Sequence, residues 1–240
     1  GENLMAPRWT EAKKRRIYDS RVQGTTLLAK ALAGLSRPPA AFVSSSAIGI
    51  YGDRGSEKID ETSSLDDSSF LARVCHDWEK ACDPAREAGV RTVNLRTGIV
   101  VAGAGGALAP MMPLFKLGLG GRFGDPSTFL SWIALDDVIG AIYHAICTES
   151  VAGPVNLTGP NPLNWDDFAS AVGEVVNRPT FVTVPTWMTR LATGEMGRDV
   201  ILSGAKVHPR ALTESGYDFL FPSVESALRH QLGYPASTHP

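Results

Sequence analysis

Apolar residues recur along the chain in two alternating patterns, one typical of helices and the other typical of buried strands. From Thr10 to about Leu35 they fall at helical intervals, with Thr10 as a candidate N-cap and Gly34 as a candidate stop. A short apolar run at 40–46 follows and turns small and polar at its last three positions. This pattern is typical of a buried strand whose carboxyl end opens into a site.

The alternation continues into the middle of the chain. Residues 47–69 are rich in Gly, Asp and Ser and have no period, so we expect a loop there. Residues 70–87 predict a helix that ends at Gly89, and residues 91–101 predict a second buried strand. Strands that alternate with helices at this length predict right-handed crossovers and a parallel sheet covered on both faces. The fold class that we expect is therefore α/β.

The composition changes after this second strand. Gly, Met and Pro are frequent at 102–130, which we expect to form a flexible cover. The pattern then predicts a strand and helix at 131–146, a strand at 153–159, a helix at 164–177, a strand at 181–184, and a strand, a proline turn and a helix at 217–232. We divide the chain into an α/β domain at 1–158 and a small substrate-binding lobe at 159–240.

Composition excludes several classes of protein. The 240 residues are 43% hydrophobic and 20% charged, which is typical of a globular protein and excludes disorder and coiled coils. There are 23 basic and 25 acidic residues, so the net charge of −2 does not favour a nucleic-acid or membrane-surface partner. No apolar run approaches the ~18–20 residues of a membrane span. We expect a small-molecule substrate and a cytoplasmic location, and the oligomeric state stays open.

Cysteines and histidines give no metal or disulfide pattern. Cys75, Cys82 and Cys147 are odd in number and lack C-x-x-C spacing, which fits a reducing compartment. The histidines are scattered without H-E-x-x-H or similar spacing, so we predict no metal site.

Three serines at the end of the first strand are the first candidates for chemistry. Ligands of open α/β sheets lie beyond the carboxyl ends of the strands, so Ser44, Ser45 and Ser46 would line a crevice. Serines at a strand end also cap loop amides, and the spacing alone does not separate these two interpretations.

Together with other motifs, these serines resemble a known family. The motifs are Ser44-Ser45-Ser46 with Tyr51-Gly52, Leu95-Arg96-Thr97-Gly98, the segments 115–121 and 131–137, and Gly153-Pro154-Val155-Asn156-Leu157. The first nine residues add the triplet GEN and the pair RW. They are similar to the extended short-chain dehydrogenase/reductases and, more closely, to their atypical "epimerase family" branch. The resemblance implies a Rossmann-type fold, a nicotinamide cofactor that is usually NADP(H) with NAD possible, and a small C-terminal substrate lobe.

The resemblance also implies roles for single residues. Gly1, Glu2 and Asn3 would lie along the cofactor, with Arg8 near its phosphates. Ser44, Ser45 and Ser46 would lie by the nicotinamide ribose, and Arg96, Thr97 and Gly98 would border the nicotinamide. Arg8 could instead be a solvated loop charge, and Arg96 could be a structural ion-pair residue.

The catalytic pair of the parent family is missing. Its active members use Tyr-x-x-x-Lys on the helix after the serine strand, where the Tyr moves a substrate proton. Leu71 and Cys75 occupy the corresponding positions, and neither side chain can do this. We take Ser46 as the residue that polarises the substrate and Tyr51 as a substitute acid, with a packing role as the alternative for Tyr51.

Two functions follow. The first is an NADP(H)-binding, epimerase-like short-chain dehydrogenase/reductase, an oxidoreductase or epimerase, that acts on an unidentified small substrate. The alternative is a non-catalytic cofactor-binding or regulatory protein, because the Tyr-x-x-x-Lys pair is absent. A nucleotide-sugar epimerase would need a diphosphate pocket, for which the sequence shows no distinct basic cluster.

The resemblance places Gly1 just after the fourth strand of the family's sheet. The glycine-rich turn that holds a pyrophosphate does not occur in these residues. We therefore expect a partial Rossmann unit that lacks its first strands, about 60 residues at usual element lengths. If this chain were the whole molecule, we would expect it to bind dinucleotide poorly.

Overall fold

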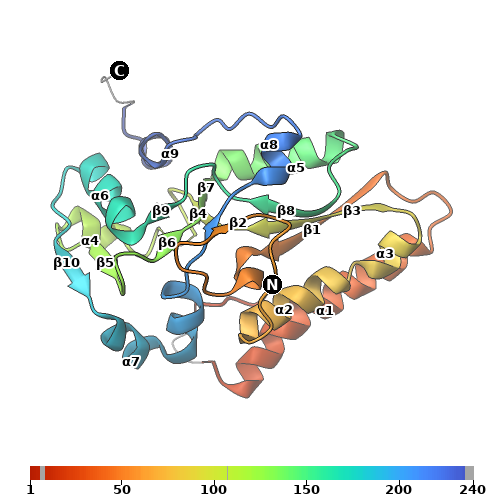
Figure 1. The fold of residues 1–240 in the computed structure, drawn as a ribbon, viewed down its shortest axis with the longest axis horizontal. Helices are drawn as coiled ribbons and strands as arrows, with labels where there is room; N and C mark the ends of the chain where they lie inside the picture. Colours follow the sequence, from red (N-terminus) through yellow and green to blue (C-terminus); the bar gives the residue numbers. More distant parts are fainter. Residues whose placement is uncertain (6–8, 107, 236–240) are drawn as a thin grey trace.

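A three-stranded parallel sheet forms the centre of the fold (Figure 1). The computed structural model describes residues 1–5, 9–106 and 108–235. The strand order is β1 (Ala41–Ala47), β3 (Arg91–Thr97) and β8 (Gly153–Leu157). In this register Ser46 pairs with Arg96, and Arg96 pairs with Asn156. The polar ends of all three strands therefore lie at one edge of the sheet.

Helices cover both faces of this sheet (Figure 1). On one face lie α1 (Glu11–Ala33), α2 (Phe70–Lys80) and α3 (Asp83–Glu87), and on the other lie α5 (Leu135–Cys147) and α8 (Arg210–Glu214). The Thr10 hydroxyl accepts a hydrogen bond from the Lys13 amide at the start of α1. The prediction that Thr10 is the N-cap is confirmed. The prediction of an α/β fold with a parallel sheet covered on both faces is confirmed.

The prediction of a single helix at 70–87 is wrong, because the structure has two helices there. The break at Ala81 and Cys82 separates α2 from α3. Pro84 lies in the first turn of α3, and in a continuous helix its ring would clash with the carbonyl of Lys80.

The strand expected at 91–101 is also interrupted. After Gly98 the chain continues as β4 (Ile99–Val101), which pairs with β7 (Trp132–Ala134) in a separate two-stranded sheet. The Gly98 amide donates to the Leu157 carbonyl, whereas the next amide, of Ile99, donates to the Ser131 carbonyl. The chain thus leaves the central sheet at this glycine.

The expected cover at 102–130 contributes both regular structure and core. It contains α4 (Met112–Lys116), β5 (Gly121–Phe123) and β6 (Phe129–Leu130). The last two pair with strands of the C-terminal part, β10 (Val182–Val184) and β9 (Leu163–Asn164). Phe115 packs in one apolar cluster with α6 (Trp165–Val176) and α9 (Val224–Leu232). The cover and the C-terminal lobe therefore share a core.

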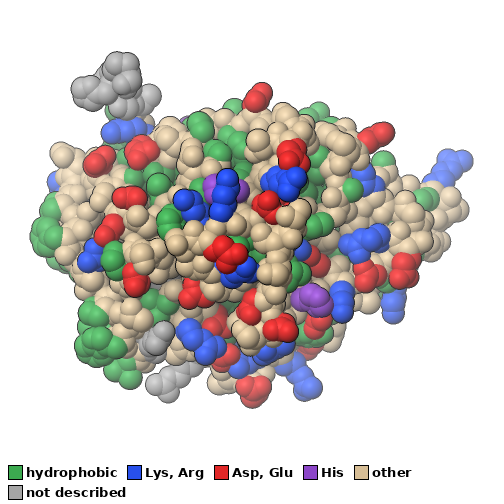
Figure 2. All heavy atoms as spheres, viewed as in Figure 1, with side chains coloured by type: hydrophobic (Ala, Val, Ile, Leu, Met, Phe, Trp, Pro, Cys, Tyr) green, Lys and Arg blue, Asp and Glu red, His purple; other side chains and the backbone are tan. Residues whose placement is uncertain are grey.

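Five further elements complete the part that surrounds the site. The loop expected at 47–69 contains a 3-10 turn, η1 (Ile48–Tyr51), and β2 (Lys58–Ile59), which pairs with β11 (Lys206–Val207). The chain also forms α7 (Thr186–Met196) and the π-helical turn η2 (Gly197–Ile201), which pack against each other. Positive and negative side chains are interspersed over the face shown in Figure 2.

The strand expected at 217–221 is wrong. This segment is irregular, and its Leu220 and Phe221 amides donate to the Asp137 carboxylate instead of to another strand. The proline turn and the following helix, α9, are present.

Candidate functional site

A buried chain of hydrogen bonds connects the carboxyl ends of the three central strands. The Ser46 hydroxyl donates to Glu79 Oε1 at 2.7 Å, and the Arg96 guanidinium donates to both Glu79 oxygens at 2.8 Å. Arg96 also donates to the Tyr51 hydroxyl, which donates to Asn156 Oδ1, each at 2.8 Å. Five side chains from β1, η1, α2, β3 and β8 therefore hold one another in fixed orientations.

Burial and neighbouring charges together set the charge states of Arg96 and Tyr51. Burial lowers the pKa of Arg96, but the Glu79 carboxylate outweighs burial and holds this pKa above its ordinary value. Burial raises the pKa of Tyr51, although the Arg96 charge opposes it. Arg96 is thus a permanent cation, and Tyr51 is a fully buried neutral phenol with both hydrogen-bonding roles of its hydroxyl occupied.

A cavity of about 370 Å³ lies beyond the carboxyl ends of β1 and β3, and we call it cavity A. Its walls include Ser46, Leu71, Cys75, Thr97, Gly98 and Asp199. Of the residues predicted from the sequence, Ser46, Thr97 and Gly98 are brought together here. The Arg96 guanidinium is held within the protein by Glu79 and Tyr51, as the structural ion-pair interpretation expects.

The wall formed by α2 carries no proton-transferring side chain at the two expected positions. Leu71 and Cys75 both face cavity A, where the parent family has its Tyr and Lys. Burial raises the pKa of Cys75 to about 12, so this thiol stays protonated at neutral pH. The proton transfer of the parent family therefore has no counterpart on this helix.

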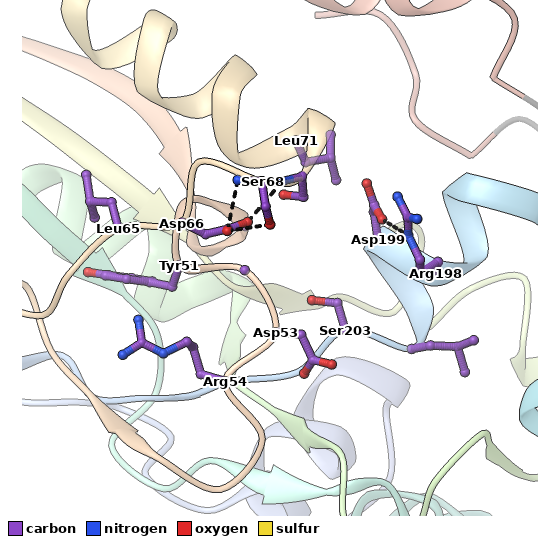
Figure 3. Close-up of a pocket in the computed structure, with 14 residues that line it drawn as sticks. Tyr51, Asp53, Arg54, Leu65, Asp66, Ser68, Leu71, Arg198, Asp199 and Ser203 are labelled. Carbon is purple, nitrogen blue, oxygen red and sulfur yellow. Dashed lines mark hydrogen bonds and ion pairs between the residues drawn. The ribbon is translucent and has the colours of Figure 1, made fainter.

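A second cavity, cavity B, has a volume of about 640 Å³ and adjoins cavity A (Figure 3). Both cavities are lined by Gly49, Gly52, Leu71, Asp199 and Ser203. Asp53, Arg54, Asp66 and Arg198 complete the charged part of its walls. A ligand in cavity B can therefore extend into cavity A.

The other predicted residues lie outside cavity A. Ser44, Ser45 and Gly1 line a hollow of about 280 Å³, hollow C, which shares Arg21 and Trp78 with cavity A.

The remaining residues of the N-terminal segment bond within it or to α1. Glu2 forms ion pairs with Lys13 at 2.6 Å and Arg16 at 3.4 Å. The Asn3 side chain accepts a hydrogen bond from the Met5 amide. Arg8 lies outside the described residues.

Sequence reasoning missed three functional residues, Glu79, Asn156 and Asp199. Glu79 had a signal, because it follows Leu71 and Cys75 at intervals of four and lies on the same face of α2. Asn156 is part of a motif that carries the family resemblance, but its bond to Tyr51 connects residues 105 positions apart. Asp199 had no signal, because it lies in the short π-helical turn η2, far along the chain from the serine strand.

Within 1–5, 9–106 and 108–235, no group of three or more His, Cys, Asp or Glu side chains could hold a metal ion. Each helix of these described ranges is too short or too polar to cross a bilayer.

A parallel sheet with helices on both faces and a cavity beyond its carboxyl ends defines a Rossmann-type protein. Epimerase family protein Mb2239 of Mycobacterium bovis is 40% identical over 240 residues, which are 100% of this chain and 77% of that protein. The chain therefore belongs to the epimerase family, and the family resemblance of its motifs is confirmed.

Solved structures agree with this assignment. The crystal structure of human epimerase family protein SDR39U1 (isoform 2) with NADPH matches 97% of this chain and 79% of that chain, with a TM-score of 0.91 and 31% identity. UDP-glucuronic acid 4-epimerase from Bacillus cereus covers 94% of this chain and 70% of that chain with a TM-score of 0.73, but at 17% identity it shows the fold alone. A family model described as a domain of unknown function, DUF1731, matches residues 184–231.

Proposed function

We propose that this chain is an NADP(H)-binding, epimerase-like oxidoreductase that acts on a small substrate in cavities A and B. The observation that carries the proposal is the position of cavity A, beyond the strand ends where Ser46, Thr97 and Gly98 meet. The human relative crystallised with NADPH supports NADP(H) over NAD.

The walls of cavity A fit a nicotinamide. They combine apolar side chains with small residues at the strand ends, among them Ser46, Ala47 and Gly98, and these leave room for a flat ring. Ser46, Thr97 and Gly98 would border the ring, and Ser44, Ser45 and Gly1 would hold its ribose in hollow C. When bound, the nicotinamide supplies or accepts a hydride.

The bond between Ser46 and Glu79 determines what Ser46 offers a substrate. Its hydroxyl hydrogen points to the Glu79 carboxylate, so its lone pairs are free to accept a hydrogen bond. Ser46 would therefore accept a hydrogen bond from the hydroxyl of an alcohol substrate. This bond would orient the carbon of that alcohol group toward the nicotinamide.

A non-catalytic cofactor-binding or regulatory protein is the second candidate. Leu71 and Cys75 favour it, because they leave α2 without a proton shuttle. Loss of general acid–base catalysis costs about 10²–10⁴-fold in rate.

A stopped-flow search in both directions separates the two candidates, with NADPH oxidation by carbonyl compounds and NADP⁺ reduction by the corresponding alcohols. We expect turnover with at least one member of a panel of small aldehydes, ketones and keto sugars and their alcohols. Saturation-transfer NMR with reduced nicotinamide mononucleotide tests cavity A directly, because this probe needs no binding site for the rest of the dinucleotide. Tight binding without turnover on any compound would favour the regulatory role, and absence of binding by the mononucleotide would contradict both.

Ser46→Ala tests the proposed role of the hydroxyl. We expect turnover to fall roughly 10- to 100-fold, the value of one hydrogen bond to a reacting group, while mononucleotide binding changes little. Ser36→Ala, in the exposed loop after α1, is the matched control. Equal turnover by Ser46→Ala and the unchanged chain would remove Ser46 from the mechanism.

We also infer a cytoplasmic location. Cys75, Cys82 and Cys147 are all free thiols, and free thiols are typical of a reducing compartment.

A further inference from the structure

Arg21 of α1 lies in the wall shared by cavity A and hollow C, and one edge of its guanidinium has no partner. Its Nη1 donates to the backbone carbonyls of Glu2 at 3.2 Å and Ile17 at 3.1 Å. Its Nε and Nη2 donate to no described residue, and neither of these two nitrogens is shut off from solvent. The Nε–Nη2 edge is therefore accessible to a ligand.

The guanidinium is held in place without an acidic partner. Its Cζ lies 5.4 Å from the centre of the Trp78 ring, and Trp78 Nε1 donates in turn to Thr25 Oγ1 at 2.9 Å. The carboxylate of Glu2 pairs with Lys13 at 2.6 Å instead of with Arg21. Within the part of the chain that the structure describes, Arg21 forms no ion pair, so its charge is free to act on a ligand.

Arg21 gives one end of cavity A a positive charge. It is the one basic side chain among the described residues that line this cavity. The one acidic side chain there, Asp199, also belongs to cavity B and pairs with Arg198 at 2.7 Å. Burial lowers the pKa of Arg21 below its ordinary value, but a guanidinium stays protonated at neutral pH. Because most of the other walls are apolar, water screens this charge weakly and an anion is favoured beside it.

The free edge also selects the shape of the anion. Nε and Nη2 present two parallel N–H bonds, which match the two oxygens of a carboxylate or two oxygens of a phosphate. Ser46, which would orient the reacting carbon, lines the same cavity of about 370 Å³. An anion bound at Arg21 and a carbon beside Ser46 can therefore belong to one small molecule, and a carboxylate fits this space better than a cofactor phosphate.

We propose that cavity A binds a substrate with a carboxylate group, which accepts hydrogen bonds from Arg21 Nε and Nη2. The alcohol or carbonyl carbon of this substrate lies toward Ser46, so the substrate class is a hydroxy acid or an oxo acid. This inference rests on the proposed function, because it names the substrate class of the same site.

The test compares two ligands of nearly one shape and different charge. Cyclohexanecarboxylate and cyclohexanecarboxamide are titrated into the chain at neutral pH and followed by saturation-transfer NMR. We expect the carboxylate to bind roughly tenfold or more tightly than the amide, since hydrogen bonds between two charged groups are the stronger ones. This comparison needs no variant of the chain.

Arg21→Gln assigns the preference to this guanidinium. We expect its affinity for the carboxylate to fall to that for the amide. Arg37→Gln, in the exposed loop after α1, is the matched control and should bind the carboxylate like the unchanged chain. Thermal melting and circular dichroism check that Arg21→Gln is folded. If that variant does not fold, Arg21→Lys takes its place and should bind the carboxylate several-fold more weakly than the unchanged chain, because an ammonium group lacks the two parallel N–H bonds.

Reduced nicotinamide mononucleotide and the reduced riboside, which lacks the phosphate, distinguish the substrate from the cofactor. We expect Arg21→Gln to leave the ratio of the two affinities unchanged. A loss confined to the mononucleotide, with carboxylate binding unaffected, would assign Arg21 to the cofactor phosphate and overturn the proposal.

Two further results would overturn it: equal affinity of the unchanged chain for the carboxylate and the amide, or equal carboxylate binding by Arg21→Gln and Arg37→Gln. A chain that binds the mononucleotide but does not prefer the carboxylate would keep the proposed function and disprove the substrate class. A chain that binds the carboxylate through Arg21 but not the mononucleotide would disprove the proposed function and keep the carboxylate site.

Discussion

At the residue scale, Glu79 is the acid on which the geometry of the site depends. Its carboxylate accepts hydrogen bonds from the Ser46 hydroxyl and the Arg96 guanidinium, and its side chain is only 15% exposed. Removing one partner of a buried ion pair leaves the other charge uncompensated, which costs more than the pair itself contributes. Glu79 is therefore expected to matter for stability as well as for the orientation of Ser46.

Glu79→Ala should lower the free energy of unfolding by about 3–5 kcal/mol, because Arg96 would stay buried without its partner. Urea denaturation followed by circular dichroism measures this loss. Glu87→Ala, at the exposed end of α3, should change stability by less than about 0.5 kcal/mol. Equal stability of the two variants would show that the Arg96 charge is compensated by another route.

At the element scale, the junction between β3 and β4 is the point where the chain passes from the central sheet to the β4–β7 pair, beside cavity A. Gly98 is the point at which the chain leaves the central sheet, and a Cβ at this position would lie 2.3 Å from the Ser131 carbonyl oxygen and 2.9 Å from Thr158 Cγ2. The contact with Ser131 involves backbone, so it cannot be relieved by a change of rotamer. The close approach of β4 to β7 therefore requires glycine here.

Gly98→Ala should destabilise the chain by about 1–3 kcal/mol or more, since the methyl group forces the two strand pairs apart. Gly24→Ala provides the contrast, because it lies inside α1 with no atom within 4 Å of the added Cβ. Alanine at position 24 should stabilise the helix by about 0.5–1 kcal/mol. Thermal melts of both variants should therefore shift in opposite directions, and a neutral Gly98→Ala would contradict this account of the junction.

At the scale of the whole molecule, Asp137 connects the central domain to the C-terminal segment. It is 1% exposed on α5 and accepts hydrogen bonds from the Leu220 amide at 2.8 Å, the Phe221 amide at 3.0 Å and the Tyr217 hydroxyl at 3.1 Å. The same carboxylate, with burial as the larger cause, raises the pKa of Tyr217. One side chain thus anchors residues about 80 positions away.

Asp137→Asn should lower the unfolding free energy by about 1–3 kcal/mol, because the two backbone amides bond to different carboxylate oxygens and one of these becomes an NH2 group that cannot accept. Hydrogen exchange should show faster exchange at Leu220 and Phe221 before the rest of the chain. Asp218→Asn, exposed in the same segment, is the control and should leave both measurements nearly unchanged. Unchanged protection of the two amides in Asp137→Asn would disprove the anchoring role.

The sequence by itself determined the local elements, because their signals lie within a few residues. The apolar period and the Thr10 cap predicted α1, and the buried run ending in three serines predicted β1. The motifs at the strand ends predicted the family. The sequence also predicted a strand after the helical region at 70–87, and β3 lies there. Pro84 was a sequence signal for the break between α2 and α3, but the apolar period of 70–87 favoured a single helix.

Only the tertiary structure decided which polar groups meet. Ser46 and Glu79 are 33 positions apart, and Tyr51 and Asn156 are 105 positions apart. Asp199 reaches the wall of cavities A and B from the C-terminal part of the chain. Helix and strand signals arise from contacts between near neighbours, whereas the site forms where strand ends from separate crossovers converge. Which residues form the site therefore depends on how distant segments pack together, and the local sequence pattern of one segment does not predict its partner.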